Sequence, residues 1–395
     1  MTTTTIRAVD ARGAIDLDRL ALGFLLALVG TLQVSIALAN ICLAGMLLCW
    51  AATLIRDRAW PTAPRFFLPL AIYAGTTLVA SVLSIDPAVS IVDSKQLALF
   101  LIVPAVFHVA QRQRGTTILD VIVSVGAVSA TFGIIQYAVL HYDSLGQRPQ
   151  GTLSHYMTYS GLLMLVISTA VARLVFARQG RTWPALVMPA LVIALALTLG
   201  RAAWVGAAAG VGLLLMLKDV RLTVLLPTAM GLLLLLAPHT VTSRALSMFD
   251  PQDPTTQDRL AMMEIGVTIV RDHPLTGVGP NMVPHVYPDY RPDYAVNPVN
   301  LHLHNVPLQI AAERGLPALA AWMWFIGAAT AANVRLFRRT AQRTLPAAAL
   351  AAIAAMLTAG LFEYNFGDSE FLMLFLILIT LPFAGNDSSR SILGK

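Results

Sequence analysis

Residues 271–315 read RDHPLTGVGPNMVPHVYPDYRPDYAVNPVNLHLHNVPLQIAAERG, and this stretch decides how the rest of the chain must be arranged. It is polar and interrupted by prolines, whereas almost everything before and after it is apolar in long blocks. A polar segment broken by prolines cannot lie in hydrocarbon, because its backbone donors and acceptors would go unpaired. We therefore expect it to lie outside a membrane or to line a wet cavity, on a platform built by the remaining residues.

The apolar blocks predict an all-α polytopic membrane protein. The chain has 395 residues, of which 57% are hydrophobic and 12% are charged, and a soluble domain carries about 25% charged residues. Long uncharged runs are typical of membrane-spanning helices. The first run is too long for a signal peptide, so we expect it to remain as an anchor. We predict twelve spans, at about residues 20–36, 38–55, 66–84, 93–110, 116–140, 155–176, 183–199, 201–217, 222–237, 315–334, 345–362 and 370–384.

The charge distribution predicts the side of the membrane on which each loop lies. The chain has 27 Lys and Arg residues and a formal net charge of +6. If the N-terminus is cytoplasmic, the outer side receives eight of these 27: Lys95, Arg148, Arg201, Arg244, Arg259, Arg271, Arg291 and Arg314. The other 19 fall on the inner side, as the positive-inside rule expects. Both termini are therefore expected in the cytoplasm, and the basic balance reflects topology rather than nucleic-acid binding.

This topology divides the chain into three parts. Residues 1–237 hold the first nine spans, residues 238–314 form a large outer loop domain, and residues 315–395 hold the last three spans and a short mobile tail. The loop domain is where we expect the chemistry, because it concentrates the polar residues outside the hydrocarbon.

Two short helices are predicted inside the outer loop domain. Thr255 and Asp258 form a capping-box-like start for the first helix, which ends at Pro274. The second helix begins near Asn305, which we expect to cap it, has a proline in its first turn, and runs to Glu313. The prolines between the two helices predict an ordered loop or short turns.

His302 and His304 are the candidate catalytic residues. Only Leu303 separates them, so both imidazoles can face one cavity. Imidazole ordinarily titrates near pH 6.5 and accepts a proton at neutral pH, which favours a general base. The alternatives are loop histidines that hydrogen-bond locally and zinc ligands. Further zinc ligands would come from His285, Asp289 or Glu313.

The outer arginines suit a phosphate ligand. A guanidinium is always charged and grips phosphate oxygens through two parallel hydrogen bonds. Several arginines at a membrane surface can hold a lipid-linked diphosphate and stabilise it as a leaving group without a metal. Arg148 and Arg201 are the strongest candidates, because no acidic residue follows within four positions, and Arg259 comes next. Arg244 and Arg271 have acidic neighbours, so we expect them to be solvated or paired.

Other polar residues have simpler interpretations. Tyr287 and the neighbouring loop tyrosines either stack on sugar rings or pack the loop onto its platform. Glu363 and Asp368 lie in the short turn before the last span, where we expect them to mark the membrane edge.

One long motif makes the chain similar to the O-antigen ligase and polymerase superfamily of bacterial membrane glycosyltransferases. The sequence HPLTGVGPN is followed by HNVPLQIAAERGLPA, which begins at His304. The ligases of that family share His, then Asn, Ser or Gln, then nine residues, Gly, two residues, and Gly, Thr or Tyr. Here His304 and Asn305 are followed by nine residues and Gly315, while Ala318 departs from the last position.

Two arginines extend this resemblance. Arg201 in GRAAW matches the family's arginine after a short outer turn, and Arg259 in DRLAMMEIG matches the arginine that opens the loop helix. The specific motifs cover about residues 199–204 and 258–318, and the rest of the resemblance is one of topology.

The resemblance implies a GT-C-like membrane glycosyltransferase in the bacterial inner membrane, with its large loop in the periplasm and membrane lipids around it. It implies transfer of an O-antigen polysaccharide from undecaprenyl diphosphate to a sugar hydroxyl of lipid A–core, in one inverting displacement. His304 would be the base, and Arg148, Arg201 and Arg259 would bind the diphosphate. We also expect substrate contacts from Asn305, His302, Arg291, Lys95 and Tyr287. The scheme needs no metal, nucleotide sugar or other cofactor.

Three other functions remain compatible with the sequence. An O-antigen polymerase uses the same donor with a growing glycan as acceptor, and a protein O-oligosaccharyltransferase uses it with a protein. A polytopic transporter belongs to a different class and should carry ionisable residues or helix breaks near the middle of the membrane. The predicted spans are nearly free of charge at that depth, which favours chemistry at the outer surface.

Overall fold

The computed structural model describes residues 16–110 and 114–384, and helices joined by turns and loops make up these two ranges, which contain no strand. The first half of the chain forms α1 (Leu17–Thr31), α2 (Ile36–Asp57), α3 (Phe67–Val82), α4 (Pro87–Asp93), η1 (Ser94–Leu101), α5 (Ile102–Val109), α6 (Arg114–Ala138), α7 (Tyr156–Phe176) and α8 (Thr182–Leu197). The second half forms α9 (Arg201–Lys218), η2 (Val220–Val224), α10 (Leu225–Leu236), α11 (His239–Leu246), η3 (Ser247–Phe249), α12 (Pro254–Asp272), α13 (Val283–Tyr290), α14 (Val306–Arg339), α15 (Thr344–Ala359), η4 (Asn365–Gly367), α16 (Ser369–Thr380) and η5 (Leu381–Phe383).

Length and composition make this an all-helical polytopic membrane protein, as predicted. Six described helices are long and apolar enough to cross a membrane: α2, the continuous run Pro87–Val109, α6, α7, α9 and α14. Five shorter apolar helices accompany them: α3, α8, the run Val220–Leu236, α15 and the run Ser369–Phe383. Each of the twelve predicted spans overlaps a helical segment. Five of the basic residues used to predict the topology, and the predicted tail, lie outside the described residues: Arg7, Arg12, Arg112, Arg390 and Lys395.

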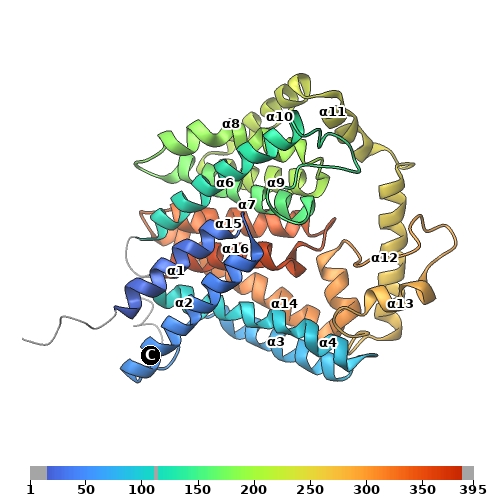
Figure 1. Ribbon diagram of the computed structural model, residues 1–395, viewed down its shortest axis with the longest axis horizontal. Helices are drawn as coiled ribbons and strands as arrows, with labels where there is room; N and C mark the ends of the chain where they lie inside the picture. The colour runs from blue at the N-terminus through green and yellow to red at the C-terminus, as the bar shows by residue number, and fades with distance from the viewer. Residues whose placement is uncertain (1–15, 111–113, 385–395) are drawn as a thin grey trace, which may run out of the picture.

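Small residues let the central helices of the bundle approach closely. α7, α15 and α16 lie at the centre (Figure 1), and every residue of α16 from Phe371 to Thr380 is buried. α9 packs on α15 through Gly206 and Gly210. A Cβ on Gly206 would lie 2.8 Å from the carbonyl oxygen of Ala355, and one on Gly210 would lie 3.0 Å from that of Ala351. Such contacts between small residues stabilise helix pairs in lipid, where the hydrophobic effect does not drive helices together.

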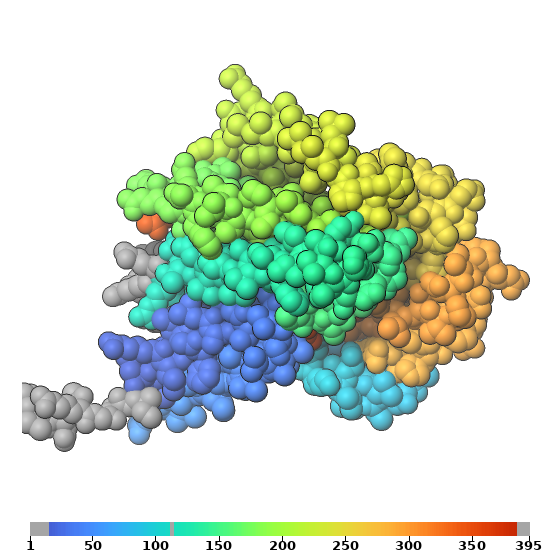
Figure 2. Space-filling model, turned by 45° about the horizontal axis from the view of Figure 1, so that its top comes forward, coloured from blue at the N-terminus to red at the C-terminus, as the bar shows by residue number. Residues whose placement is uncertain are grey.

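The polar outer segment leaves the bundle at one end. α12 stands beside the bundle and connects the region of α11 to α13 (Figure 1). In Figure 2 the yellow and orange surface of this segment lies at the opposite end from the blue N-terminal helices. The segment has a small apolar core of its own, which includes Ile265, Ile269, Val283 and Tyr287. It therefore forms a packed unit on the bundle rather than a loose loop.

The helices of this segment differ in two respects from the prediction. α11 and α13 are present in addition to α12 and the start of α14, where two short helices were expected. α13 tolerates Pro284 because this residue lies in its first turn, where a backbone N–H has no helical partner. The predicted Thr255 cap was wrong: Asp253 caps α12 by accepting a hydrogen bond from the amide of Thr256 (3.2 Å). Pro254 at the first helical position fixes this earlier start.

α14 is two helices joined at Gly315, as the predicted break at this residue requires. Gly315 has φ 78° and ψ 171°, and a Cβ there would lie 2.1 Å from the carbonyl oxygen of Leu275, so only glycine fits. The segment after α12 supplies the hydrogen bonds that the kink interrupts. The amide of Val278 donates to the carbonyl of Ala312 (2.9 Å), and the amide of Leu316 donates to that of Pro274 (2.8 Å). The two quoted motif segments, 273–281 and 304–318, are therefore packed against each other.

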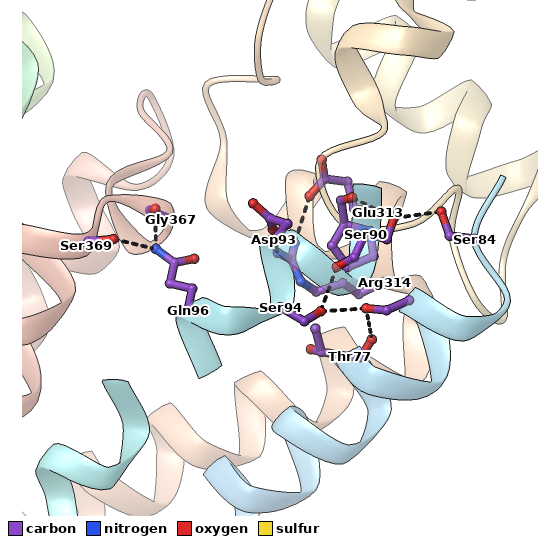
Figure 3. A network of polar contacts seen from close by, with 12 residues as sticks. Thr77, Ser84, Ser90, Asp93, Ser94, Gln96, Glu313, Arg314, Gly367 and Ser369 are labelled. Atoms are coloured by element: carbon purple, nitrogen blue, oxygen red, sulfur yellow. Dashed lines mark hydrogen bonds and ion pairs between the residues drawn. The ribbon is translucent and has the colours of Figure 1, made fainter. Parts of the chain in front are cut away.

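A buried ionic group lies directly beside this kink, and we call Asp93, Glu313 and Arg314 the closed cluster (Figure 3). Arg314 Nη1 lies 2.8 Å from Glu313 Oε2, and Arg314 Nη2 lies 3.8 Å from Asp93 Oδ2. Serine hydroxyls surround it, including Ser84 and Ser90, which are 2.7 Å apart. Ser84 and Ser90 also donate to the carbonyl oxygens of Val278 and Pro280 (3.2 and 2.8 Å). The closed cluster and these serines thus join α4 and the turn before it to α14 and the turn after α12, which fixes the outer segment to the bundle.

Candidate active site

A cavity of about 280 Å³ opens where the outer segment meets the bundle. Its walls come from α7, α9, α11, α12, the loop before α14 and the turn between α15 and α16. The polar side chains that line it are Arg148, Tyr156, Ser160, Arg201, Arg244, Thr255, Asp258, Arg259, Asn297, Asn300, His304, Glu363 and Asn365. Four segments that the sequence placed on the outer side thus meet at one place: 141–154, 199–202, 238–314 and the turn near 363.

His304 is held in a fixed position at the start of α14. Asn305 caps this helix by accepting a hydrogen bond from the amide of Leu308 (2.9 Å), which confirms the predicted cap. Just before His304, the buried Leu303 donates its amide hydrogen to Gln309 Oε1 (2.6 Å). His304 itself has φ 48°, a conformation that non-glycine residues adopt uncommonly. The backbone on both sides of the imidazole is therefore constrained.

Glu363 orients the His304 ring. Nδ1 of His304 lies 2.9 Å from Glu363 Oε1, and Nε2 of His302 lies 3.2 Å from the same oxygen. The amide of Tyr364 also donates to this oxygen (3.0 Å). Burial alone would raise the pKa of the Glu363 carboxyl, but His304 and His302 outweigh burial and hold the pKa below its ordinary value. Glu363 is therefore a carboxylate that only accepts hydrogen bonds.

The protonation of the His304 ring follows from this contact. An ionised carboxylate has no proton to donate, so the ring nitrogen that faces it must carry the hydrogen. In neutral His304 the hydrogen is therefore on Nδ1, and Nε2 keeps its lone pair. A histidine whose free nitrogen is unprotonated and whose other nitrogen is held by a carboxylate is the arrangement of a general base.

Arg201 lies at the first position of α9, and its side chain ties three elements together. Its Nη1 donates to the carbonyl oxygen and the Oγ of Ser247 (3.1 and 3.0 Å), and its Nη2 lies 3.2 Å from Asp253 Oδ1. Arg244 Nη1 lies 3.6 Å from the other oxygen of Asp253. Burial alone would raise the pKa of Asp253, but Arg201 and Arg244 outweigh it and lower the pKa. The Asp253 carboxylate is thus paired with two guanidinium groups.

Arg148 and Arg259 form no ion pair among the described residues, although Glu363 lies close enough to Arg259 to oppose the effect of burial on its pKa. Arg148 donates from Nε to the carbonyl of Leu145 (3.0 Å), and its guanidinium carbon lies 4.2 Å from the centre of the Tyr156 ring. Arg259 makes no hydrogen bond or ion pair within residues 16–110 and 114–384, and its buried Nε has no partner. Burial lowers the pKa of both guanidinium groups, as it also lowers that of Arg244 to about 10.

These four arginines form what we call the open cluster: Arg148, Arg201, Arg244 and Arg259. A guanidinium group stays protonated in proteins, so the cluster carries four positive charges. Asp253 is the one carboxylate bonded to any of them in the described part of the chain. Arg201 and Arg244 are buried, and Arg148 and Arg259 are half-buried. Four such cations around one bonded carboxylate favour an anionic ligand, and guanidinium groups bind phosphate oxygens in pairs.

The structure brings together some of the predicted site residues and separates others. Arg148, Arg201, Arg259 and His304 line the cavity, and His302 reaches it through Glu363. Asn305 caps α14 and lines a neighbouring apolar groove. Three predicted substrate contacts do not line the cavity: Lys95, Tyr287 and Arg291.

Each of these three residues has a different environment. Lys95 is exposed on η1. Arg291 donates to the carbonyl of Ala295 (3.1 Å). Tyr287 is fully buried and accepts a hydrogen bond from Asn300 (2.9 Å), so of its two predicted roles it packs the loop.

Glu363, Asp253 and Arg244 are site residues that sequence reasoning missed. Glu363 was expected only to mark the membrane edge, although its contact with His304 spans 59 positions of sequence. Arg244 was expected to be solvated or paired with a near neighbour, Asp250, and it instead faces Asp253 and lines the cavity. The clue available in the sequence was a carboxylate at the outer end of a span, opposite a histidine in an outer loop.

His302, His304 and Glu363 form a group that could hold a metal ion. The nitrogen and oxygen atoms of His302, His304 and Glu363 all lie within 4.8 Å of one another. Of the ligands proposed from the sequence, His302 and His304 belong to this group, whereas His285, Asp289 and Glu313 do not in the described residues. Glu313 is instead paired with Arg314 in the closed cluster.

An apolar groove of about 280 Å³ adjoins the cavity and shares Arg201, Arg259 and His304 with it. The apolar side chains that line it include Val205, Met248, Leu260, Met263, Leu361 and Phe362. Several of these are exposed, Leu260 to 57% and Leu361 to 52%. The cationic site is therefore open on one side to an apolar ligand or to lipid.

Fold and site together define a class: an all-helical membrane protein with an arginine cluster and a carboxylate-oriented histidine at one end of its bundle. Residues 185–323 match the family model described as O-antigen ligase, which confirms the predicted resemblance and supports membership of the O-antigen ligase family. The matched segment contains Arg201, Arg244, Arg259 and His304. A comparison with curated proteins found no match to the chain. The match supports an activity of the ligase or polymerase type in general, without distinguishing the two.

Proposed function

We propose that this chain is an O-antigen ligase, which transfers an O-antigen polysaccharide from undecaprenyl diphosphate to a sugar hydroxyl of lipid A–core. The observation that carries the proposal is the pairing of the open cluster with His304 and Glu363 in one cavity. The arginines suit a diphosphate, and the histidine suits a hydroxyl nucleophile. A transferase that uses a lipid diphosphate donor needs both functions at adjacent positions.

The proposed reaction is a single displacement. The acceptor hydroxyl oxygen attacks the anomeric carbon of the donor sugar, the bond from that carbon to the diphosphate oxygen breaks, and undecaprenyl diphosphate leaves with the electron pair. The hydroxyl proton passes to Nε2 of His304, and the resulting imidazolium is stabilised by Glu363. Arg148, Arg201 and Arg259 stabilise the charge that develops on the diphosphate. Attack from the face opposite to the leaving group inverts the anomeric configuration.

The apolar groove supports a lipid-linked donor. It begins at Arg201 and Arg259 and is lined farther out by exposed apolar side chains such as Leu260 and Phe362. A diphosphate held by the arginines would place its polyprenyl chain along this groove, which faces lipid in the proposed orientation. Burial of apolar surface at about 25 cal/mol per Å² would add to the affinity for the donor.

The proposed orientation puts the outer segment in the periplasm and both termini in the cytoplasm, with twelve spans in the inner membrane and a GT-C-like arrangement. The charge distribution supports it, and so does the meeting of four predicted outer segments at the cavity. Reporter fusions after residue 395 and inside the 238–314 segment test it. We expect cytoplasmic and periplasmic signals respectively, and a periplasmic C-terminus would contradict the twelve-span topology.

A reconstituted transfer reaction tests the activity. The purified chain is mixed with a polysaccharide on undecaprenyl diphosphate and with lipid A–core, in the presence of EDTA. We expect polysaccharide of unchanged length on lipid A–core and free undecaprenyl diphosphate. Longer glycans that remain on the carrier would instead identify a polymerase, and transfer to an added protein an oligosaccharyltransferase. Dependence on an added divalent ion would contradict the metal-independent scheme.

A further inference from the structure

His302, His304 and Glu363 together have the geometry of a three-ligand metal site. Glu363 Oε1 lies 2.9 Å from Nδ1 of His304 and 3.2 Å from Nε2 of His302. Zinc binds histidine nitrogen and carboxylate oxygen at about 2.0–2.2 Å, so neighbouring ligand atoms in a tetrahedral site lie about 3.3 Å apart. The two measured separations need to change by only a few tenths of an ångström. No other group of three such residues is found in the described ranges.

The three ligands are held in place before any ion arrives. Leu303, between the two histidines, is buried and its amide is bonded to Gln309. The amide of Tyr364 donates to the same Glu363 oxygen (3.0 Å). The two imidazole centres are 4.4 Å apart. Little conformational entropy would be lost on metal binding, because the backbone on each side is already fixed.

We propose that these three side chains bind Zn²⁺ and that this binding inhibits the enzyme. The inhibition rests on the proposed function, in which His304 is the base. Zinc would bind Nδ1 of His304, so the hydrogen of that neutral ring moves to Nε2. The proton count of the ring is unchanged, but Nε2 no longer has a lone pair for the acceptor hydroxyl. His302 binds through Nε2, so the hydrogen that Nε2 directs at Glu363 likewise moves, to Nδ1, while Glu363 contributes its existing negative charge.

Zinc suits this ligand set better than Mg²⁺ or Ca²⁺ does. Imidazole nitrogen is a preferred ligand of zinc, whereas Mg²⁺ and Ca²⁺ require mostly oxygen. Three protein ligands leave the fourth position for water from the cavity, since His304 and Glu363 both line it. The open cluster lines the same cavity and repels a dication. We therefore expect a dissociation constant on the order of micromolar, weaker than that of structural zinc sites.

Direct binding tests the site without reference to activity. Full-length protein in detergent is titrated with ZnCl₂ in a calorimeter, alongside His302→Gln and the matched control His285→Gln, whose histidine is exposed in the same outer segment. We expect one zinc per chain in the wild type and the control. In His302→Gln the affinity for zinc should fall at least about tenfold, because losing even a hydrogen-bond partner of a metal ligand lowers metal affinity by about 10–100-fold. Absence of saturable binding, or equal affinity in His302→Gln, would overturn the proposal.

A second measurement guards against a variant that does not fold. Wild-type protein loaded with Co²⁺ should show the intense visible absorption of four-coordinate cobalt, and added Zn²⁺ should remove it. Weak six-coordinate absorption would overturn the predicted site.

The inhibitory step is tested in the transfer reaction. Each variant is compared with its own zinc-free rate, because His302 lies beside the proposed base. Zinc should inhibit the wild type and His285→Gln in the micromolar range, and EDTA should restore transfer. The inhibitory concentration should rise at least about tenfold in His302→Gln. If zinc binds at His302 but no preparation transfers glycan, the proposed function fails while the site stands. If transfer proceeds and zinc neither binds nor inhibits, the site fails alone.

Discussion

The closed cluster and the open cluster are both built from arginines and carboxylates, but only in the closed cluster are the charges balanced by the protein. In the closed cluster Arg314 faces two carboxylates, Glu313 and Asp93, and serine hydroxyls surround the group (Figure 3). In the open cluster four guanidinium groups share one bonded carboxylate, Asp253. Both clusters lie where the outer segment meets the bundle: the closed cluster on α4 and α14, and the open cluster on α9, α11, α12 and the loop before α7. Their difference is the balance of charge, not the type of residue.

This difference separates stability from function. A buried charge whose partners come from the protein is already compensated, so it holds elements together and has little left for a ligand. A partly buried charge without a partner costs stability until an anion arrives. We therefore expect changes in the closed cluster to lower the free energy of unfolding. Changes in the open cluster and its histidine should lower the rate of transfer.

The largest effect should come from the base beside the open cluster. His304→Ala should lower the rate of transfer by about 10²–10⁴-fold, because general-base assistance contributes that much. Donor binding should persist, since the arginines remain, and can be measured with a labelled undecaprenyl-diphosphate glycan. His302→Ala should lower the rate less. If His304→Ala keeps more than a tenth of the wild-type rate, His304 is not the base.

The next effect tests the closed cluster. Arg314→Ala leaves Glu313 buried without its partner, and breaking a buried ion pair in this way costs about 3–5 kcal/mol of stability. Denaturant titration in detergent measures the loss. The double variant Glu313→Met with Arg314→Met should recover most of it, because both charges are removed together. Transfer per folded molecule should change little. A large loss of rate at full stability would place Arg314 in the reaction and break the comparison.

Arg259 gives the matched test in the open cluster. Arg259→Ala should lower the rate of transfer by about 10²–10³-fold, the usual result of removing one group that stabilises developing charge. Arg259→Lys should recover little, because an ammonium cannot make the paired hydrogen bonds of a guanidinium. The free energy of unfolding should stay unchanged or rise, since Arg259 has no protein partner within the described ranges.

Arg201 sharpens this test because it both lines the cavity and bonds to other parts of the protein. Its bonds to Ser247 and Asp253 predict that Arg201→Ala lowers stability as well as rate. Equal stability losses in Arg201→Ala and Arg259→Ala would contradict our distinction between the two.

The smallest effect concerns the cap that fixes His304. Asn305→Ala removes the acceptor for the Leu308 amide and should cost about 1 kcal/mol of stability. The rate should fall further than this stability loss explains, because His304 directly precedes the cap. Asn305→Asp, which retains the acceptor, should restore most of the rate. If both variants transfer at the wild-type rate, the cap does not position the base.

Much of the fold follows from the sequence because its determinants are local. Twelve apolar runs, the polar segment between the ninth and tenth, the Asn305 cap and the break at Gly315 all depend on hydrophobicity or on backbone chemistry within a few residues. The start of α12 was expected at Thr255, because Thr255 and Asp258 match the capping-box pattern. The helix begins two positions earlier, with Asp253 as its cap and Pro254 at its first position. His304, Arg201 and Arg259 were found through short motifs, and the structure brings them to one cavity.

The sequence by itself determined an all-helical membrane protein, a polar outer segment and a histidine next to a helix cap. Only the tertiary structure decided which charges meet. Glu363 reaches His304 across 59 positions, and Asp253 reaches Arg201 across 52, because the packing of helices brings their ends together. Lys95 and Arg291, which were also expected from the sequence to contact the substrate, do not line the cavity. The physical reason is that hydrophobicity selects helices locally, whereas the balance of charge at a site depends on distances that only the packed bundle fixes.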